Sequence, residues 1–169
     1  HPTLGLYPAT HAKNTPYEPA ICVPLIMWGA GVSSPNRSYD HLVSCVDIMP
    51  TILDVCGVAL PSRTIDGVSF AGVLANTSSA AIRTEAYSEW GLPLHAATYA
   101  DRTSTAWAML GPTYKLLLNG VSGTLEFYNL TADPMEATNL TPLGVTSGLS
   151  VPQLAEFNRL LLAFTTLVP

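Results

Sequence analysis

The stretch that decides the fold is residues 114–130, with the sequence YKLLLNGVSGTLEFYNL. It holds two short runs of strand-forming residues, Tyr114 to Leu118 and Thr124 to Leu130. Asn119-Gly120 follows the first run, and this dipeptide is a strong signal for the tight turn of a β-hairpin. The stretch therefore predicts two antiparallel strands joined by a short connection.

The surrounding sequence extends this hairpin into a small α+β subdomain. Strand-like runs also occur at Thr84 to Trp90 and Thr105 to Leu110, separated by Gly and Pro turns. Residues 151–167 close the chain with apolar residues at helical spacing. The expected apolar stripe is Leu154, Phe157, Leu161 and Phe164. We expect residues 81–169 to form an antiparallel sheet with a terminal helix packed against it.

The first half of the chain has a different texture and predicts part of an α/β domain. Residues 21–28 are an almost continuous apolar run, as in a strand buried on both faces of a mainly parallel sheet. Pro24 fits only near the first residues of such a strand, where no ladder donor is needed. We therefore interpret residues 1–80 as the C-terminal part of an α/β domain, with 21–28 at the edge of its sheet. Trp28 is expected in the core.

A helix is predicted over residues 47–56 and is expected to pack on that strand. Either Ser44 caps it with Asp47 reaching back, or Asp47 is itself the cap, and Pro50 suits a first turn. Gly57 ends the helix. The residues expected on its apolar face are Val46, Met49, Leu53 and Cys56.

The composition is unusually apolar for a free-standing domain. Hydrophobic residues make up 48% and charged residues 11%, against a typical charged share of about 25%. No run approaches the ~18 apolar residues of a membrane span. The chain also begins with His1 and not Met. We expect no membrane span, and expect another polypeptide or a missing part of the same one to cover much of this surface.

The charge distribution argues against a nucleic-acid partner. The net charge is −5, and the seven Lys and Arg residues form no basic stripe. Cys22, Cys45 and Cys56 are odd in number and lack metal-ligand spacing, so they are expected to be buried free thiols. Four Asn-x-Ser/Thr sequons favour a secretory route. They begin at Asn36, Asn76, Asn129 and Asn139.

Three groups of short motifs occur in order along the chain. The first is KNTPYE at 13–18, running into VPLI at 23–26; the second is VDIMPTIL at 46–53, followed by DGVSF at 66–70. The third is YKL at 114–116, FYNL at 127–130, DPME at 133–136 and then Asn139-Leu140. Together they resemble the sulfatase family of the alkaline-phosphatase-like superfamily.

This resemblance implies a large α/β sheet, a smaller C-terminal antiparallel sheet, and hydrolysis of sulfate esters at a calcium-assisted formylglycine. In that chemistry a hydrated aldehyde supplies the nucleophilic oxygen, and cations neutralise the sulfate oxygens. The nucleophile motif C/S-x-P-S-R is not present. Pro61-Ser62-Arg63 matches its last three positions, but Cys56 precedes Pro61 by five residues where the motif needs two. We expect Ca²⁺, its ligands and the formylglycine to be supplied by the N-terminal remainder of the same protein. The chain alone is expected to be inactive.

Two residues are candidates for the substrate site. Lys13 matches the lysine that contacts the substrate's sulfate in the family, where an ammonium stabilises charge. His11 lies close enough in sequence to share that site as a proton donor, although a surface loop histidine is the alternative. His1 could belong to a metal pair, but Pro2 stands where glycine is expected. No catalytic residue or metal ligand is assigned.

Glu18 is expected to order its loop, and Asp47 to cap its helix and not to bind metal. Two alternative functions stay open: a phosphonate or phosphate ester hydrolase of the same superfamily, or a non-catalytic sulfatase-like binding protein. The second is suggested by the rearranged sequence before Lys13 and by Cys22, where many relatives carry Arg. The expected location is secreted, lysosomal or periplasmic.

Overall fold

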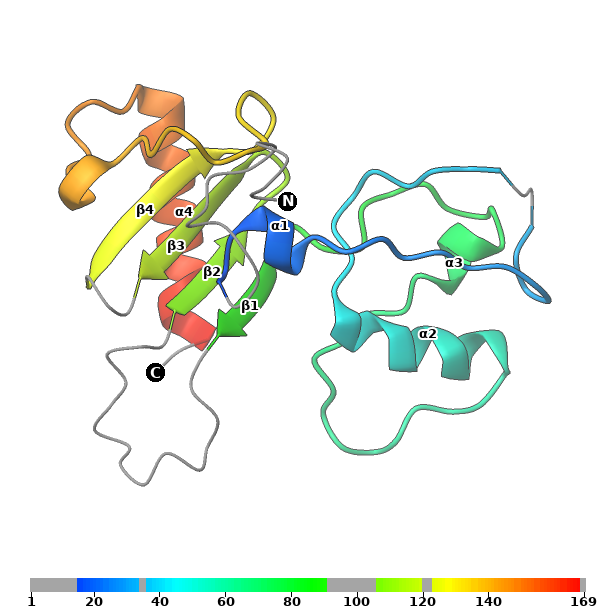
Figure 1. Ribbon diagram of the computed structural model, residues 1–169. Helices are drawn as coiled ribbons and strands as arrows, with labels where there is room; N and C mark the ends of the chain where they lie inside the picture. Colours follow the sequence, from blue (N-terminus) through cyan, green and yellow to red (C-terminus); the bar gives the residue numbers. More distant parts are fainter. Residues whose placement is uncertain (1–14, 34–35, 91–105, 120–122, 168–169) are drawn as a thin grey trace. The chain divides into compact units, whose positions relative to one another are not determined.

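The computed structural model of the chain describes residues 15–33, 36–90, 106–119 and 123–167 (Figure 1). It divides into two compact units. Unit 1 contains residues 1–23 and 87–169, and unit 2 contains residues 24–86. The boundary near residue 80 between an α/β part and a C-terminal subdomain stays a prediction.

Unit 1 is built on a sheet of four strands in the order β1-β2-β3-β4, counted over the described residues. The strands are β1 (Ala86–Trp90), β2 (Ala106–Leu110), β3 (Tyr114–Asn119) and β4 (Thr124–Asn129). Strand β3 pairs antiparallel with both β2 and β4, and Lys115 lies opposite Leu110 on one side and Tyr128 on the other. The predicted hairpin and the mixed α/β class are confirmed.

One face of the sheet packs against the terminal helix α4 (Val151–Leu167), which lies behind the sheet in Figure 1. The core joins Met109, Leu116 and Phe127 of the strands to Phe157, Leu160 and Phe164 of the helix. The rings of Phe127 and Phe157 meet edge to face with centroids 5.4 Å apart. The predicted helix is confirmed, but its buried stripe is centred on Leu160, while Leu161 is half-buried.

The opposite face of the sheet carries a different set of side chains. Because side chains alternate along a strand, Lys115 and Leu117 point away from α4. Ala106 and Ala108 of β2 are also buried. The short helix α1 (Glu18–Ile21), drawn in blue, lies in front of the sheet in Figure 1. The sheet thus lies between α4 and the segment that opens the described chain.

Unit 2 contains the 3₁₀ turn η3 (Cys45–Asp47), helix α2 (Ile48–Val55) and helix α3 (Ala71–Leu74), joined by long irregular segments. The predicted helix is confirmed. The Ser44 option describes the preceding turn η3, because the Asp47 carboxylate accepts a hydrogen bond from the Ser44 N–H at 2.8 Å. Asp47 itself stands at the N-cap position of α2, without a side-chain bond to the helix N–H groups. The helix ends at Val55, Cys56 is its C-cap, and Gly57 follows with φ +67°.

The prediction of a strand over residues 21–28 is wrong for this structure. Ile21 ends α1, and residues 22–28 run without regular secondary structure. Val23, Leu25, Ile26 and Trp28 are exposed, from 46% at Leu25 to 83% at Trp28, and Met27 is half-buried. Trp28 is therefore not a core residue here. An extended segment becomes a strand only when neighbouring backbone groups pair with it, and the described part of the chain offers no such neighbour to this segment.

The apolar side chains of helix α2 are also exposed, because no described residues cover them. Of the predicted face, Val46 is 49% and Met49 40% exposed, Cys56 is exposed and Leu53 is half-buried. Ile52 and Val55 are also exposed, at 50% and 40%. The predicted packing of this helix on a strand is therefore not observed. Cys22, Cys45 and Cys56 are exposed free thiols, and the prediction that they are buried is wrong. All three lie on the segments whose apolar neighbours are themselves uncovered.

We expect the core of unit 1 to depend on Leu160. Replacing this fully buried residue by alanine (Leu160→Ala) removes contacts to both strands and helix, and should lower the free energy of unfolding by about 2–5 kcal/mol. Leu162→Ala, on the same helix but at a 69% exposed position, should change it by less than about 0.5 kcal/mol. Urea titration of the two variants compares them; equal losses would contradict the assigned core.

Candidate functional site

The two substrate-site candidates, Lys13 and His11, lie outside the described residues, as does His1. The described chain begins at Thr15, two residues after Lys13. The neighbourhood of the candidate site is therefore defined by the residues that hold segment 15–22 in place. These residues come from the far end of the sequence.

A buried ion cluster of Lys115, Glu136 and Glu18 anchors this segment. Lys115 on β3 is fully buried, and its Nζ lies 2.7 Å from Glu136 Oε1 and 3.2 Å from Glu18 Oε1. The first contact is an ion pair and not a well-aligned hydrogen bond. The backbone N–H of Glu18 donates to Glu136 Oε2 at 2.6 Å. Glu18 therefore orders its loop, as expected from the sequence, by joining two partners on the C-terminal side of the chain.

The electrostatics of this cluster are those of charges removed from water. Burial raises the pKa of the Glu136 carboxyl, while the Lys115 ammonium and the Glu18 N–H oppose that shift. Removing one partner of a buried pair leaves the other charge uncompensated, which is strongly destabilising. The cluster therefore fixes where each of its members must lie.

A second cluster on the same face consists of Tyr17, Glu126 and Tyr128. Both phenol hydroxyls donate to Glu126 Oε2, at 2.7 Å from Tyr17 and 2.8 Å from Tyr128. The two rings meet edge to face at 6.1 Å, and Lys115 Nζ lies 5.9 Å from the centre of the Tyr17 ring. Burial raises the pKa of both phenols above the usual value, and the Glu126 carboxylate adds to the shift.

The third group of motif residues shapes the turn that carries Glu136. The Asp133 carboxylate accepts hydrogen bonds from the N–H groups of Ala137 at 3.1 Å and Thr138 at 2.8 Å. Glu136 itself has φ +54°, a conformation that costs energy outside glycine. Asn139 Oδ1 accepts from the Phe127 N–H of β4 at 3.0 Å. Together these bonds tie the turn to the sheet and direct Glu136 toward Lys115.

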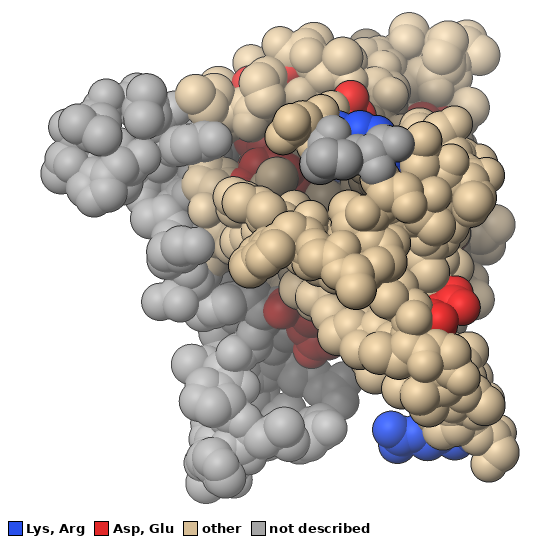
Figure 2. Space-filling view, turned by 90° about the vertical axis from the view of Figure 1, so that its right-hand side faces the viewer, with Lys and Arg blue, Asp and Glu red and all other residues tan. Residues whose placement is uncertain are grey.

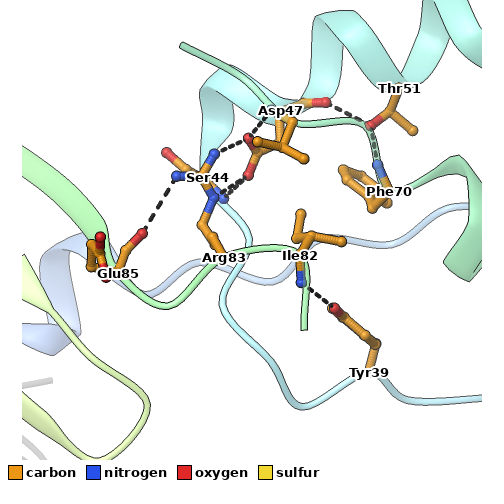
Figure 3. Close-up of polar contacts among 9 residues, drawn as sticks. Tyr39, Ser44, Asp47, Thr51, Phe70, Ile82, Arg83 and Glu85 are labelled. Carbon is orange, nitrogen blue, oxygen red and sulfur yellow. Dashed lines mark hydrogen bonds and ion pairs between the residues drawn. The ribbon is translucent and has the colours of Figure 1, made fainter. Parts of the chain in front are cut away.

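The second group of motif residues forms a separate polar cluster in unit 2, centred on the buried Asp47 (Figure 3). Its carboxylate accepts from the N–H groups of Ser44 and Val68, each at 2.8 Å, and from the guanidinium of Arg83, with Nε at 2.9 Å. Arg83 Nη2 also contacts Asp47 Oδ1. Both carboxylate oxygens are therefore engaged, in accord with a structural role for Asp47.

The residues around Gly67 pack against the start of α2 and form hydrogen bonds with it. The Thr51 hydroxyl donates to the Asp47 carbonyl at 2.6 Å and accepts from the Phe70 N–H at 3.0 Å. A Cβ at Gly67 would lie 2.0 Å from the Val46 carbonyl oxygen, so only glycine fits there. The VDIMPTIL and DGVSF motifs are thus two halves of one packed unit and contribute no reactive group.

The described residues contain no candidate metal centre. Among them, no three His, Cys, Asp or Glu side chains gather to hold a metal ion. The Ca²⁺ ion implied by the resemblance therefore has no fitting ligand set in this part of the chain. In the same residues, no helix is long and apolar enough to cross a bilayer.

Comparison with known proteins shows the family. Residues 9–149 match the family described as "N-sulphoglucosamine sulphohydrolase, C-terminal". Arylsulfatase K of Mus musculus is 34% identical over 138 residues, which are 76% of this chain and 23% of that protein. The Delta 4,5-hexuronate-2-O-sulfatase of Bacteroides thetaiotaomicron is 29% identical over 126 residues, covering 73% of this chain and 25% of that enzyme.

Solved structures agree with these sequence relatives. A putative sulfatase from Bacteroides thetaiotaomicron superposes with a TM-score of 0.64 at 26% identity, covering 82% of this chain and 28% of that one. A 2-O GAG sulfatase gives a TM-score of 0.62 at 27% identity, covering 82% and 28%. The chain belongs to the sulfatase family and matches its C-terminal domain. It spans about a quarter of the length of the curated relatives it matches.

Sequence reasoning missed the partners of the substrate-site segment. Lys115 belongs to the YKL motif and Glu136 to DPME, but no motif connects either residue to Glu18. The available signal was a lysine inside a strand of apolar residues, YKLLLN, because a cation at a buried position needs an anionic partner. Which carboxylates serve it could not be read from spacing, since Glu18 lies 97 residues away.

The raised pKa values of the Tyr17 and Tyr128 phenols predict that the free energy of unfolding of unit 1 falls at alkaline pH. Tyr17 and Tyr128 ionise near pH 10 when unfolded but only at higher pH when folded. Their contribution to stability is complete below about pH 10 and is lost as the pH rises above it. Chemical denaturation between pH 8.5 and 11.5 should show falling stability, with a shallower fall in the Tyr17→Phe/Tyr128→Phe double variant. A fall of equal steepness in both proteins would contradict this origin.

Proposed function

We propose that this chain is the C-terminal part of an enzyme that hydrolyses sulfate esters. The observation that carries the proposal is the sulfatase-family match over residues 9–149, which includes the KNTPYE motif. In this proposal Lys13 contacts a sulfate oxygen of the substrate. A fixed ammonium at that position stabilises the negative charge that develops as the ester bond breaks.

The reacting groups lie elsewhere in the complete protein. The chain contains no C/S-x-P-S-R motif, so the formylglycine and the Ca²⁺ ion with its ligands would come from the N-terminal remainder. His11 is proposed as a hydrogen-bond donor to the substrate beside Lys13. The chain by itself is proposed to bind or orient sulfate and not to turn over an ester.

The exposed apolar surface of the described residues supports the proposal that a large part of the same protein packs against it. The uncovered apolar side chains between residues 23 and 68 include Val23, Leu25, Ile26, Trp28, Val46, Met49, Ile52, Val55, Val58 and Leu60. Figure 2 shows a face of the molecule on which charged side chains are sparse. An exposed apolar surface of this extent is typical of an interface. We propose that the N-terminal remainder of the protein covers it.

The location proposed for the enzyme is secreted, lysosomal or periplasmic. The four sequons support a secretory route. Among them, Asn36 and Asn76 are exposed. Asn139 instead uses its side-chain oxygen to bind the backbone of β4. The side-chain oxygen of Asn76 also accepts a hydrogen bond, from Arg37 at 3.0 Å. A glycan would therefore be accommodated most readily at Asn36.

The role of Lys13 is tested in the complete protein. A charge-assisted contact of about 1.5–3 kcal/mol predicts that Lys13→Ala lowers kcat/KM for a sulfate ester by about 10- to 100-fold, with little change in melting temperature. Arg63→Ala is the matched control, because it removes a cation from an exposed position in unit 2. Unchanged kinetics in Lys13→Ala would remove Lys13 from the substrate site.

The class of ester is tested with matched substrates. Phosphonate monoester hydrolases share the fold, with a TM-score of 0.53 at 23% identity for that of Agrobacterium radiobacter. The complete protein should show a higher kcat/KM for an aryl sulfate than for the corresponding aryl phosphonate monoester. The reverse order would favour the phosphonate hydrolase, and no turnover of either would favour a non-catalytic binding protein.

A further inference from the structure

We propose that Tyr17 and Glu18 are positioning residues, which hold the segment leading from Lys13 in register on the C-terminal sheet. This inference rests on the proposed function of Lys13 and adds to it the device that fixes its approach to the substrate. Neither residue would touch the reacting atoms. Both act through contacts with strands β3 and β4 and the turn after them.

Tyr17 and Glu18 are consecutive in sequence, and both contact the same face of the sheet. The Tyr17 hydroxyl donates to Glu126 Oε2 on β4 at 2.7 Å. The Glu18 carboxylate lies 3.2 Å from the Lys115 ammonium, and the Glu18 N–H donates to Glu136 at 2.6 Å. Pro16, the residue before them, is buried. The segment is therefore fixed at several successive positions, each by a different partner.

The segment cannot hold this conformation by itself. Helix α1 has four residues, no side-chain cap and no buried residue. A helix of one turn does not form in isolation, because its nucleation cost is not repaid by further hydrogen bonds. Its place therefore depends on partners 97 to 118 residues away in the sequence.

Lys13 is close enough in sequence for the contacts of Tyr17 and Glu18 to restrict its position. Two residues of chain span at most about 7 Å, so the Lys13 backbone is tethered within that distance of Thr15. Transition-state stabilisation depends steeply on geometry, and a displacement of about 1 Å can cost up to ~100-fold in rate. Loosening Tyr17 or Glu18 should therefore lower turnover even though both side chains face the sheet.

The structure offers a matched pair of variants. Tyr17→Phe and Tyr128→Phe each delete one phenol hydroxyl that donates to the same oxygen of Glu126, at 2.7 and 2.8 Å. Tyr17 belongs to the segment after Lys13, whereas Tyr128 belongs to strand β4. A merely structural role for the Glu126 cluster would make the two variants alike. A positioning role would make them differ in catalysis.

The experiment compares kcat, KM and melting temperature of both variants in the complete protein, with a sulfate ester as substrate. Both should lower the melting temperature by a similar amount, about 2–4 °C. Tyr17→Phe should lower kcat/KM by about 3- to 10-fold, and Tyr128→Phe should stay within about twofold. Equal kinetic effects, or none in Tyr17→Phe, would overturn the proposal.

A double-mutant cycle separates this inference from the proposed function. In a Lys13→Ala background, Tyr17→Phe should cost little further activity, because the group that it positions is gone. If Lys13→Ala alone leaves activity unchanged, the proposed function fails; if it is impaired and the two effects multiply in full, only the positioning role fails. Glu18→Gln, which weakens the Lys115 pair but keeps the N–H bond to Glu136, should show the same non-additivity.

Discussion

The fold of unit 1 depends on one buried cation. Lys115 lies within an apolar strand with no exposure to solvent, and its charge is balanced by Glu136 from the turn after β4 and by Glu18 from the opening segment. An ammonium removed from water is tolerated only when oppositely charged groups surround it closely. The cation therefore requires the first and last parts of the chain to meet on one face of the sheet. The hydrophobic core against α4 stabilises the sheet, but it does not determine where the segment that carries Glu18 contacts the sheet.

The motifs that identify the family serve architecture in every described case. VDIMPTIL and DGVSF interlock through Asp47, Thr51 and Gly67, and DPME delivers Glu136 to Lys115. This explains why the described residues carry so clear a family pattern although none of them is assigned a catalytic role. In our proposal the C-terminal part of the enzyme supplies position and one cation, and the N-terminal remainder supplies the chemistry.

Local patterns predicted the local structure well. The strands β2 to β4 and helices α2 and α4 follow from side-chain alternation, helical spacing and the Asn119-Gly120 turn, all of which act between near neighbours in sequence. The prediction of a strand over residues 21–28 is wrong because their apolar run indicates burial but not the identity of the covering surface. The described residues include no such surface, and the segment is irregular and exposed. The ion cluster escaped prediction because electrostatic pairing over such sequence separations leaves no periodic trace.

The central claim is that the segment after Lys13 is held on the C-terminal sheet by the cluster around Lys115. Amide hydrogen exchange at Glu18 in the complete protein tests it most directly, because this N–H donates to the buried Glu136 carboxylate at 2.6 Å. The account predicts slow exchange at Glu18, comparable to that of the central amides of β3 and β4 and lost in Glu136→Ala. Fast exchange at Glu18 while the strand amides stay protected would contradict it.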